Sequence, residues 1–236
     1  MIATLPTPYY ERDGIVIYCA DCRDILPHLV RVDRVITDPP YGVGFDSKMA
    51  KQRNGKVRTI QGGYGFDDTP EYVGEVVIPS IVRCIELAKS VVITPGTKSM
   101  WLYPVPSDVG CWYSAAGTGL SSWGFRCSQP ILYYGSDPYL STGKGARPNS
   151  VGQVWPNDAN DSGHPCAKPI RFVKWLVTRS SLENETVLDP FMGSGTTLRA
   201  ALDTGRKAIG IEISEKYCEI AVRRLQQSVM RFDIPA

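Results

Sequence analysis

The sequence predicts an α/β protein in which helices cover a mostly parallel sheet. Short apolar runs rich in Val and Ile alternate along the chain with amphipathic helical patterns, which is typical of this fold class. The chain has 236 residues, of which 43% are apolar, so it is long enough to bury one sizeable core. We therefore expect residues 1–236 to form a single domain.

Six apolar runs are predicted to be strands. Each is short, rich in β-branched residues and followed by a polar turn, as strands buried on both faces usually are. The predicted strands are Ile15–Cys19, Val32–Thr37, Ser90–Thr94, Ile131–Tyr134, Thr186–Leu188 and Lys207–Ile213.

Helical patterns lie between several of these strands. Apolar residues recur at helical spacing in Glu71–Leu87, Pro169–Ser180 and Thr196–Asp203. Gly205 is placed to end the third of these helices, since glycine favours the position just beyond a helix. A last helix is predicted to begin after Ser214, which is a good N-cap residue.

Two segments interrupt the alternation. Residues 44–66 contain several glycines, one acid and five cations, so we expect a mobile basic loop there. Its cations are Lys48, Lys51, Arg53, Lys56 and Arg58. Residues 136–163 are rich in Ser, Gly, Pro and Asn and contain the cations Lys144 and Arg147, which suggests a short insert rather than a second domain.

Composition and charge narrow the classes of function. The net charge is only +2, so a polyanion would have to bind a local basic patch. No run approaches the ~20 apolar residues of a membrane span, and no signal peptide is evident, so we expect a cytoplasmic protein without membrane association. Cys19 and Cys22 form a CxxC pair without two further ligands at suitable spacing, so no metal site is predicted.

The first candidate site is Asp38–Tyr41, an Asp-Pro-Pro-Tyr segment that directly follows the predicted strand Val32–Thr37. Ligands of open α/β sheets bind beyond the carboxyl ends of the strands, where this segment should lie. A Pro-rich turn that only caps a strand would have the same composition. Taken alone, the segment leaves both interpretations open.

The second candidate site is Leu188–Thr197, in which a strand runs into a glycine turn and then a helix. Backbone N–H groups at such a helix start can hold a carboxylate or a phosphate. The segment lacks the Lys of a P-loop, and Leu198 stands where a dinucleotide fingerprint has its third glycine. A nucleoside without a long polyphosphate therefore fits better.

Glu212 is the third candidate, at the end of the next predicted strand and 17 residues after Gly195. An acid near this spacing is the usual acceptor for ribose hydroxyls in such units. The alternative is a surface Glu before a helix. The three signals together favour a nucleoside site.

These segments resemble the DNA amino-methyltransferases that depend on S-adenosylmethionine, of the permuted β-class that acts on adenine N6 or cytosine N4. The resemblance rests on four motifs in the order of that class, and it covers most of the chain. The motifs are Asp38–Tyr41, the HPxxKP segment His164–Pro169, Phe191–Gly195, and Gly210–Ile213 followed by Tyr217, Ala221 and Arg224-Leu225. It implies a Rossmann-like, doubly wound, mostly parallel sheet of seven strands with circularly permuted motif order.

The resemblance also implies roles for the Asp-Pro-Pro-Tyr segment. The Asp38 carboxylate and the Pro39 carbonyl would accept hydrogen bonds from the exocyclic amino group, which is otherwise a poor nucleophile. Pro40 would stiffen the turn, and Tyr41 would stack on the base. A base within a duplex cannot reach such a pocket, so the target nucleotide would be flipped out.

For the cofactor, the resemblance implies that the glycine turn holds the methionine end, Glu212 the ribose and Asp21 the adenine end. Lys168 is a further candidate, for the cofactor carboxylate or a phosphate, although it could instead be solvated. His164 is more consistent with a structural turn. The full set of predicted cofactor residues is Asp21, Lys168, Asp189, Pro190, Phe191, Gly193, Ser194, Gly195, Thr196, Thr197 and Glu212.

The function implied by the resemblance is site-specific methylation of adenine N6 in double-stranded DNA. Cytosine N4 is the nearest alternative, although those relatives more often have Ser in place of Asp38. RNA or protein-glutamine methylation and a non-catalytic nucleic-acid-binding protein are further alternatives. Residues 136–163 would form a short target-recognition insert, and the cations of both interrupting segments would contact DNA. A homodimer and a separate restriction endonuclease are compatible partners.

Overall fold

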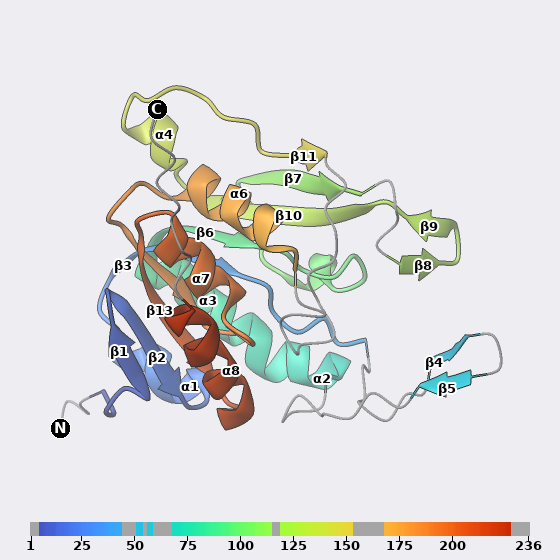
Figure 1. The fold of residues 1–236 in the computed structure, drawn as a ribbon. Helices are drawn as coiled ribbons and strands as arrows, with labels where there is room; N and C mark the ends of the chain where they lie inside the picture. The colour runs from blue at the N-terminus through green and yellow to red at the C-terminus, as the bar shows by residue number, and fades with distance from the viewer. Residues whose placement is uncertain are drawn as a thin grey trace, which may run out of the picture.

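The computed structural model describes residues 5–43, 51–53, 56–58, 68–114, 119–152 and 168–227. Within these ranges one large mixed sheet forms the centre of the molecule (Figure 1). Its strand order is β1 (Tyr10–Arg12), β2 (Ile15–Cys19), β13 (Lys207–Glu212), β12 (Thr186–Asp189), β3 (Val32–Thr37), β6 (Ala88–Ile93), β10 (Ser128–Gly135), β7 (Asp108–Tyr113) and β11 (Val151–Gly152).

The centre of the sheet is parallel, as predicted. Strands β2, β13, β12, β3 and β6 pair parallel in that order, whereas β10 is antiparallel to both of its neighbours. The strands from β2 to β7 make up the expected sheet of seven. Two short strands, β1 and β11, extend its edges to give nine in the described part of the chain.

Helices pack on both faces of the sheet, because successive strand residues point to opposite sides. On β3, Val35 belongs to the core cluster beneath α3 (Ile78–Leu87), whereas its neighbour Ile36 packs with α6 (Ile170–Ser180). The second face is completed by α7 (Thr196–Asp203) and α8 (Glu215–Gln226), which enclose a third cluster with β2 and β13. Figure 1 shows α6, α7 and α8 side by side on one face. The sheet is therefore doubly wound.

The predicted helix at 71–87 is divided into three parts. It consists of α2 (Pro70–Tyr72), a π-helical segment η2 (Val73–Val77) and α3. Pro79 has no N–H, so the regular hydrogen-bond ladder cannot continue through the start of α3. The other helices begin and end close to the predicted bounds, with Pro169 as the N-cap of α6 and Gly205 at a φ of 73° beyond α7.

Several short elements were not predicted from the sequence. They are α1 (Cys22–Ile25), the 3-10 turns η1 (Leu26–His28) and η3 (Met100–Leu102), α4 (Pro138–Ser141), and two antiparallel hairpins, β4 (Lys51–Arg53) with β5 (Lys56–Arg58) and β8 (Gly119–Ser121) with β9 (Gly124–Arg126). The rest of the predicted basic loop and residues 153–163 of the predicted insert lie outside the described residues.

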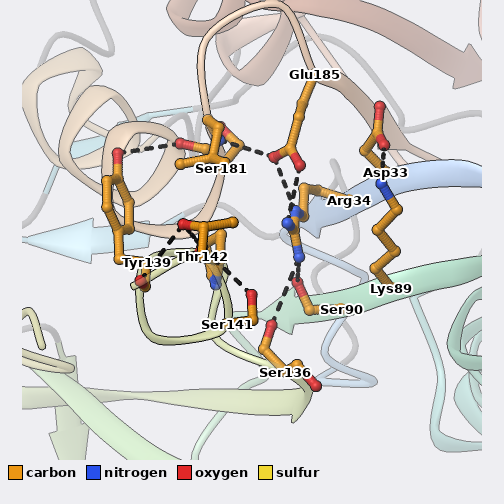
Figure 2. Close-up of polar contacts among 12 residues, drawn as sticks. Asp33, Arg34, Lys89, Ser90, Ser136, Tyr139, Ser141, Thr142, Ser181 and Glu185 are labelled. Carbon is orange, nitrogen blue, oxygen red and sulfur yellow. Dashed lines mark hydrogen bonds and ion pairs between the residues drawn. The ribbon is translucent and has the colours of Figure 1, made fainter. Parts of the chain in front are cut away.

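A buried ion pair joins the central strands at their amino ends. The guanidinium of Arg34 on β3 donates to both carboxylate oxygens of Glu185, at 2.8 and 2.9 Å, and to Ser90 Oγ on β6 at 3.0 Å (Figure 2). Nearby, Lys89 Nζ lies 2.7 Å from the Asp33 carboxylate. These contacts fix β3 against β6 and the start of β12, at the sheet edge opposite the candidate site.

Two further findings concern only the described residues. No helix among them has both the length and the apolar character that a membrane span requires. They contain no group of three or more side chains that could hold a metal ion, and their cysteines, including Cys19 and Cys22, are free thiols.

Candidate active site

A cavity opens at the carboxyl ends of β2, β3, β12 and β13. The strands are parallel and adjacent there, so the segments that follow them meet although they are far apart in the sequence. Many of the predicted site residues line this cavity: Asp21, Asp38, Pro39, Pro40, Tyr41, Lys168, Pro190, Phe191, Gly193 and Glu212. The fold therefore brings the Asp-Pro-Pro-Tyr segment and the glycine turn into one site.

Asp38 is held by three donors. Its Oδ1 accepts hydrogen bonds from the hydroxyls of Tyr41, at 2.6 Å, and Thr94, at 2.7 Å. Its Oδ2 lies 2.7 Å from the Lys168 ammonium, in an ion pair that leaves the carboxylate about one third exposed. The carboxylate is thus fixed in orientation and still reaches the cavity.

The Tyr41 hydroxyl is part of the same network. It accepts a hydrogen bond from Lys168 Nζ at 2.7 Å and another from the side-chain amide of Gln129 on β10. The ring packs so closely on Gly96 that a Cβ there would lie 2.9 Å from Tyr41 Cγ. Only glycine leaves room for the ring in this position.

The turn after Tyr41 is held by Asp68, which caps two backbone N–H groups. Its carboxylate accepts from Gly42 at 2.7 Å and from Val43 at 3.4 Å. Gly42 has a φ of 68°, a conformation that favours glycine. Asp68 itself lines the cavity.

Three residues of the site were not predicted from the sequence: Thr94, Gln129 and Asp68. Thr94 could have been found, because it ends a predicted strand that neighbours the one before Asp38. Gln129 and Asp68 gave no local signal, since their contacts with the site join segments 88 and 26 residues apart.

Glu212 is buried beside the glycine turn. Its two carboxylate oxygens accept backbone hydrogen bonds from Gly193, at 3.0 Å, and Ser214, at 2.9 Å. Burial raises the pKa of Glu212 to about 7. Each carboxylate oxygen has a second lone pair, so the side chain can also accept from a ligand in the cavity that it lines.

Asp189 lies beneath the cavity rather than on its lining. Only 2% of the residue is exposed, and its Oδ1 accepts from Thr37 Oγ1 at 2.6 Å and from the Phe191 N–H at 3.1 Å. Burial raises its pKa to about 6. Asp189 therefore joins the end of β3 to the end of β12 instead of reaching toward a ligand.

The start of α7 also lies behind the cavity lining. Gly195 has a φ of 76°, and a Cβ there would lie 2.7 Å from the Ala221 Cβ, so α7 and α8 require glycine at this position. Ser194 and Thr196 accept hydrogen bonds from the Arg224 guanidinium. Thr197 is buried and is a hydrogen-bond partner of Asp189.

Asp21 lines the cavity just beyond the end of β2. It is the N-cap of α1 and accepts from the Arg23 N–H at 2.8 Å. Its carboxylate also pairs with the Arg23 guanidinium at 2.6 Å. These hydrogen bonds from Arg23 hold the pKa of Asp21 below its usual range.

Of the predicted DNA-contacting residues, the structure describes the side chains of Lys144 and Arg147 only. Arg147 stacks on the Tyr139 ring, 3.6 Å from its centroid, beyond the end of β10 and therefore at the sheet edge opposite the cavity. Lys144 is exposed and lies at the same edge, where its backbone N–H donates a hydrogen bond to the Tyr139 carbonyl. The side chains of Lys48, Lys51, Arg53, Lys56 and Arg58 lie outside the described part of the chain, as does His164.

The fold and the cavity define the class of this protein. A mostly parallel doubly wound sheet carries an Asp-Pro-Pro-Tyr turn and a strand–glycine–helix turn at one edge, in the order expected for DNA methylases. Known proteins agree with this assignment. A sequence model of the N6/N4 DNA methylase family matches residues 122–223.

Individual relatives extend the match beyond this segment. YubD of Escherichia coli (strain K12), a protein named as a methylase, is 31% identical over 202 residues, which cover 82% of each chain. The chain therefore belongs to the N6/N4 family of DNA methylases.

Solved structures agree on the fold. The M1.HpyAVI–SAM complex superposes with a TM-score of 0.64 at 21% identity and covers 90% of this chain and 99% of its own. The PvuII DNA methyltransferase, which is described as cytosine-N4-specific, has a TM-score of 0.63 at 16% identity over 94% of this chain and 90% of its own.

Proposed function

We propose that this protein transfers the methyl group of S-adenosylmethionine to the exocyclic N6 of an adenine flipped out of duplex DNA. The observation that carries the proposal is the Asp38 carboxylate, which is fixed by three donors yet open to a cavity that also contains Glu212 and Gly193. Membership of the DNA methylase family supports DNA as the methyl acceptor.

The chemistry requires two hydrogen-bond acceptors beside the amino group. The lone pair of an exocyclic amine is delocalised into the ring, so the nitrogen attacks poorly. The Asp38 carboxylate and the Pro39 carbonyl would accept from its two N–H groups and draw it toward tetrahedral geometry, with the lone pair aimed at the methyl group. After transfer the nitrogen is cationic and acidic, and Asp38 or water takes its proton.

The residues of the cavity fit the cofactor. Bound S-adenosylmethionine supplies an electrophilic methyl group on a sulfonium. Glu212 would accept from its ribose hydroxyls, Asp21 would bind the adenine end, and the turn at Gly193 would hold the methionine end. A buried carboxylate that is already oriented by two backbone N–H groups is well suited to a ribose. The solved M1.HpyAVI complex with SAM, which has this fold, supports the same choice.

The choice of adenine rests on Asp38, since cytosine-N4 relatives more often have Ser in this position. The same acceptor geometry serves both amino groups, and the cytosine-N4-specific PvuII enzyme shares the fold. Cytosine N4 is therefore the second candidate.

The test is to incubate the protein with duplex DNA and labelled S-adenosylmethionine, digest the DNA to nucleosides and identify the product by mass spectrometry. We expect N6-methyladenine from the wild type and none from Asp38→Ala, with cofactor binding retained in both. N4-methylcytosine would keep the mechanism and change the base. Cofactor binding without any DNA methylation would contradict the proposal and favour RNA or protein as the acceptor.

A further inference from the structure

The β8–β9 hairpin presents two aromatic side chains to solvent. Trp123 in its two-residue turn is 98% exposed, and Phe125 on β9 is 79% exposed. A single exposed aromatic residue needs no explanation, but two on one short hairpin, neither packed against the protein, indicate a surface that binds a partner.

The hairpin is anchored to the candidate active site. Strand β9 leads through Cys127 into β10, where the side-chain amide of Gln129 donates to the Tyr41 hydroxyl. On β9 itself, Arg126 donates to Thr97 Oγ1 at 2.6 Å, in the loop that follows β6 at the carboxyl edge of the sheet. Neighbouring strand residues point to opposite faces, so Arg126 fixes one face while Phe125 faces outward.

The place of the hairpin indicates its partner. Figure 1 shows β8–β9 and β4–β5 extending beyond the same side of the sheet. A base that enters the cavity beside Tyr41 is part of a polymer, and the nucleotides on either side of it must remain outside, along this edge. Exposed aromatic rings provide stacking platforms for bases, and inserted apolar side chains can separate neighbouring bases.

A protein partner fits less well. Two aromatic rings on a projecting two-stranded ribbon offer stacking surfaces for bases rather than the broad apolar patch, roughly 800 Å² from each partner, of a stable protein interface. A narrow projecting hairpin is better suited to the groove or the base stack of a nucleic acid.

We propose that the β8–β9 hairpin binds the DNA beside the target nucleotide, where Trp123 and Phe125 stack on neighbouring bases and compensate for the stacking that is broken when the target base leaves the helix. This inference rests on the proposed function and adds to it the element that opens the duplex.

The test compares one DNA in two forms, native plasmid and the same plasmid heat-denatured. For the double variant Trp123→Ala/Phe125→Ala we expect about a tenfold or greater loss of kcat/KM on the native form and a much smaller loss on the denatured form, where no base pair has to open. Trp123→Phe should restore most of the activity, because it keeps a stacking ring. Tyr9→Ala, which removes an exposed aromatic residue beside β1 at the far edge of the sheet, is the matched control and should change neither rate.

A binding measurement separates this inference from the proposed function. The tryptophan emission of the wild type should be quenched when duplex DNA is added, and most of this quenching should be absent in Trp123→Phe, even if no methylation of DNA were detected. Equal losses on native and denatured DNA would overturn the role in duplex opening. Unchanged DNA binding and activity together with an altered oligomeric state in the double variant would overturn the proposal in favour of a protein partner.

Discussion

At the scale of single residues, Lys168 has the most informative position. The sequence alone is compatible with either a cofactor contact or a solvated side chain. The Lys168 ammonium lies 2.7 Å from both Asp38 Oδ2 and the Tyr41 hydroxyl, and only 13% of its side chain is exposed. It is thus a counter-ion that orients the proposed catalytic carboxylate.

This position predicts the effect of Lys168→Met. Loss of a hydrogen bond to a charged group in a site of this kind costs about 1.5–3 kcal/mol, so kcat should fall by roughly 10- to 150-fold. Cofactor affinity, measured by calorimetry, should change little, and Lys168→Arg should retain part of the activity. Weakened cofactor binding with kcat intact would instead assign Lys168 to the cofactor.

Glu212 predicts a pH dependence of cofactor binding. Its pKa of about 7 is raised by burial, so the unliganded protein gains a proton there as the pH falls through 7. The ionised carboxylate is the better acceptor for ribose hydroxyls, and cofactor affinity should therefore rise between pH 6 and 8. Calorimetric titration of the wild type and Glu212→Gln measures this: the variant should bind more weakly at pH 8 and lose the dependence.

Ionisation of Glu212 as the pH rises should strengthen cofactor binding but lower the stability of the fold. Since the pKa of Glu212 is higher in the folded state than the ordinary 4.5, its contribution to the free energy of unfolding is present in full below about pH 4.5 and is lost as the pH rises through about 7. Cofactor should oppose this loss, because it binds the folded state.

At the scale of elements, the Arg34–Glu185 pair holds β3 in place at the end opposite the site. Only 4% of the Arg34 side chain and 14% of the Glu185 side chain are exposed, so removal of Arg34 leaves the Glu185 carboxylate largely buried without its counter-ion. Arg34→Met should lower the free energy of unfolding by about 3 kcal/mol or more, as measured by urea denaturation. The double variant Arg34→Met/Glu185→Leu should recover much of the loss; a double variant no more stable than Arg34→Met would contradict this account.

Some helices and strands could be predicted from the sequence, and others could not. Strands β2 and β3 and helix α7 have the predicted bounds, because each has strong periodicity and clear end signals. Strand β7 was missed. It begins with Asp108 and contains Gly110, neither of which is typical of a strand. Glycine is required at position 110, because a Cβ there would lie 2.0 Å from the Asn149 carbonyl oxygen. That approach of two backbones is a tertiary constraint that no local pattern reveals.

For the site, the sequence predicted the turns to which we assign the chemistry but not the residues that support them. Asp38 and Gly193 follow strands whose carboxyl ends meet, so their proximity follows from the sheet. Asp189, which was expected to contact the cofactor, instead bonds to Thr37. Its role depends on the adjacency of β3 and β12, and strand order cannot be read from local patterns.

At the scale of the whole molecule, the net charge of +2 leaves DNA binding to local patches. Strands β4 and β5, which contain four of the five cations of residues 44–66, extend beyond the same side of the sheet as β8–β9 (Figure 1), whereas Arg147 lies at the edge opposite the cavity. The two groups predicted together from the sequence are therefore expected to differ in their contribution to DNA binding.

Salt dependence of DNA binding separates them. Replacement of Lys48, Lys51, Arg53, Lys56 and Arg58 by Gln should weaken binding and flatten the slope of log K against log salt by about 0.9 for each phosphate that is no longer neutralised. The matched control, Lys144→Gln/Arg147→Gln, should leave the slope unchanged. If the slope were the same in the five-residue variant and the wild type, the basic segment would have no role in phosphate binding.

The strand order has a consequence for how this chain could be divided. Strands β12 and β13 come late in the sequence but lie between β2 and β3, which come early. A cut between Gly152 and Lys168 would give one fragment whose sheet lacks β12 and β13 and a second fragment that consists mainly of those strands and their helices. Neither could bury its apolar strand faces alone, and Asp38 would be on one piece and Glu212 on the other. The two fragments should therefore be inert separately and regain methyl transfer when each is fused to one of two proteins that bind each other, which would make this fold a two-part reporter of proximity.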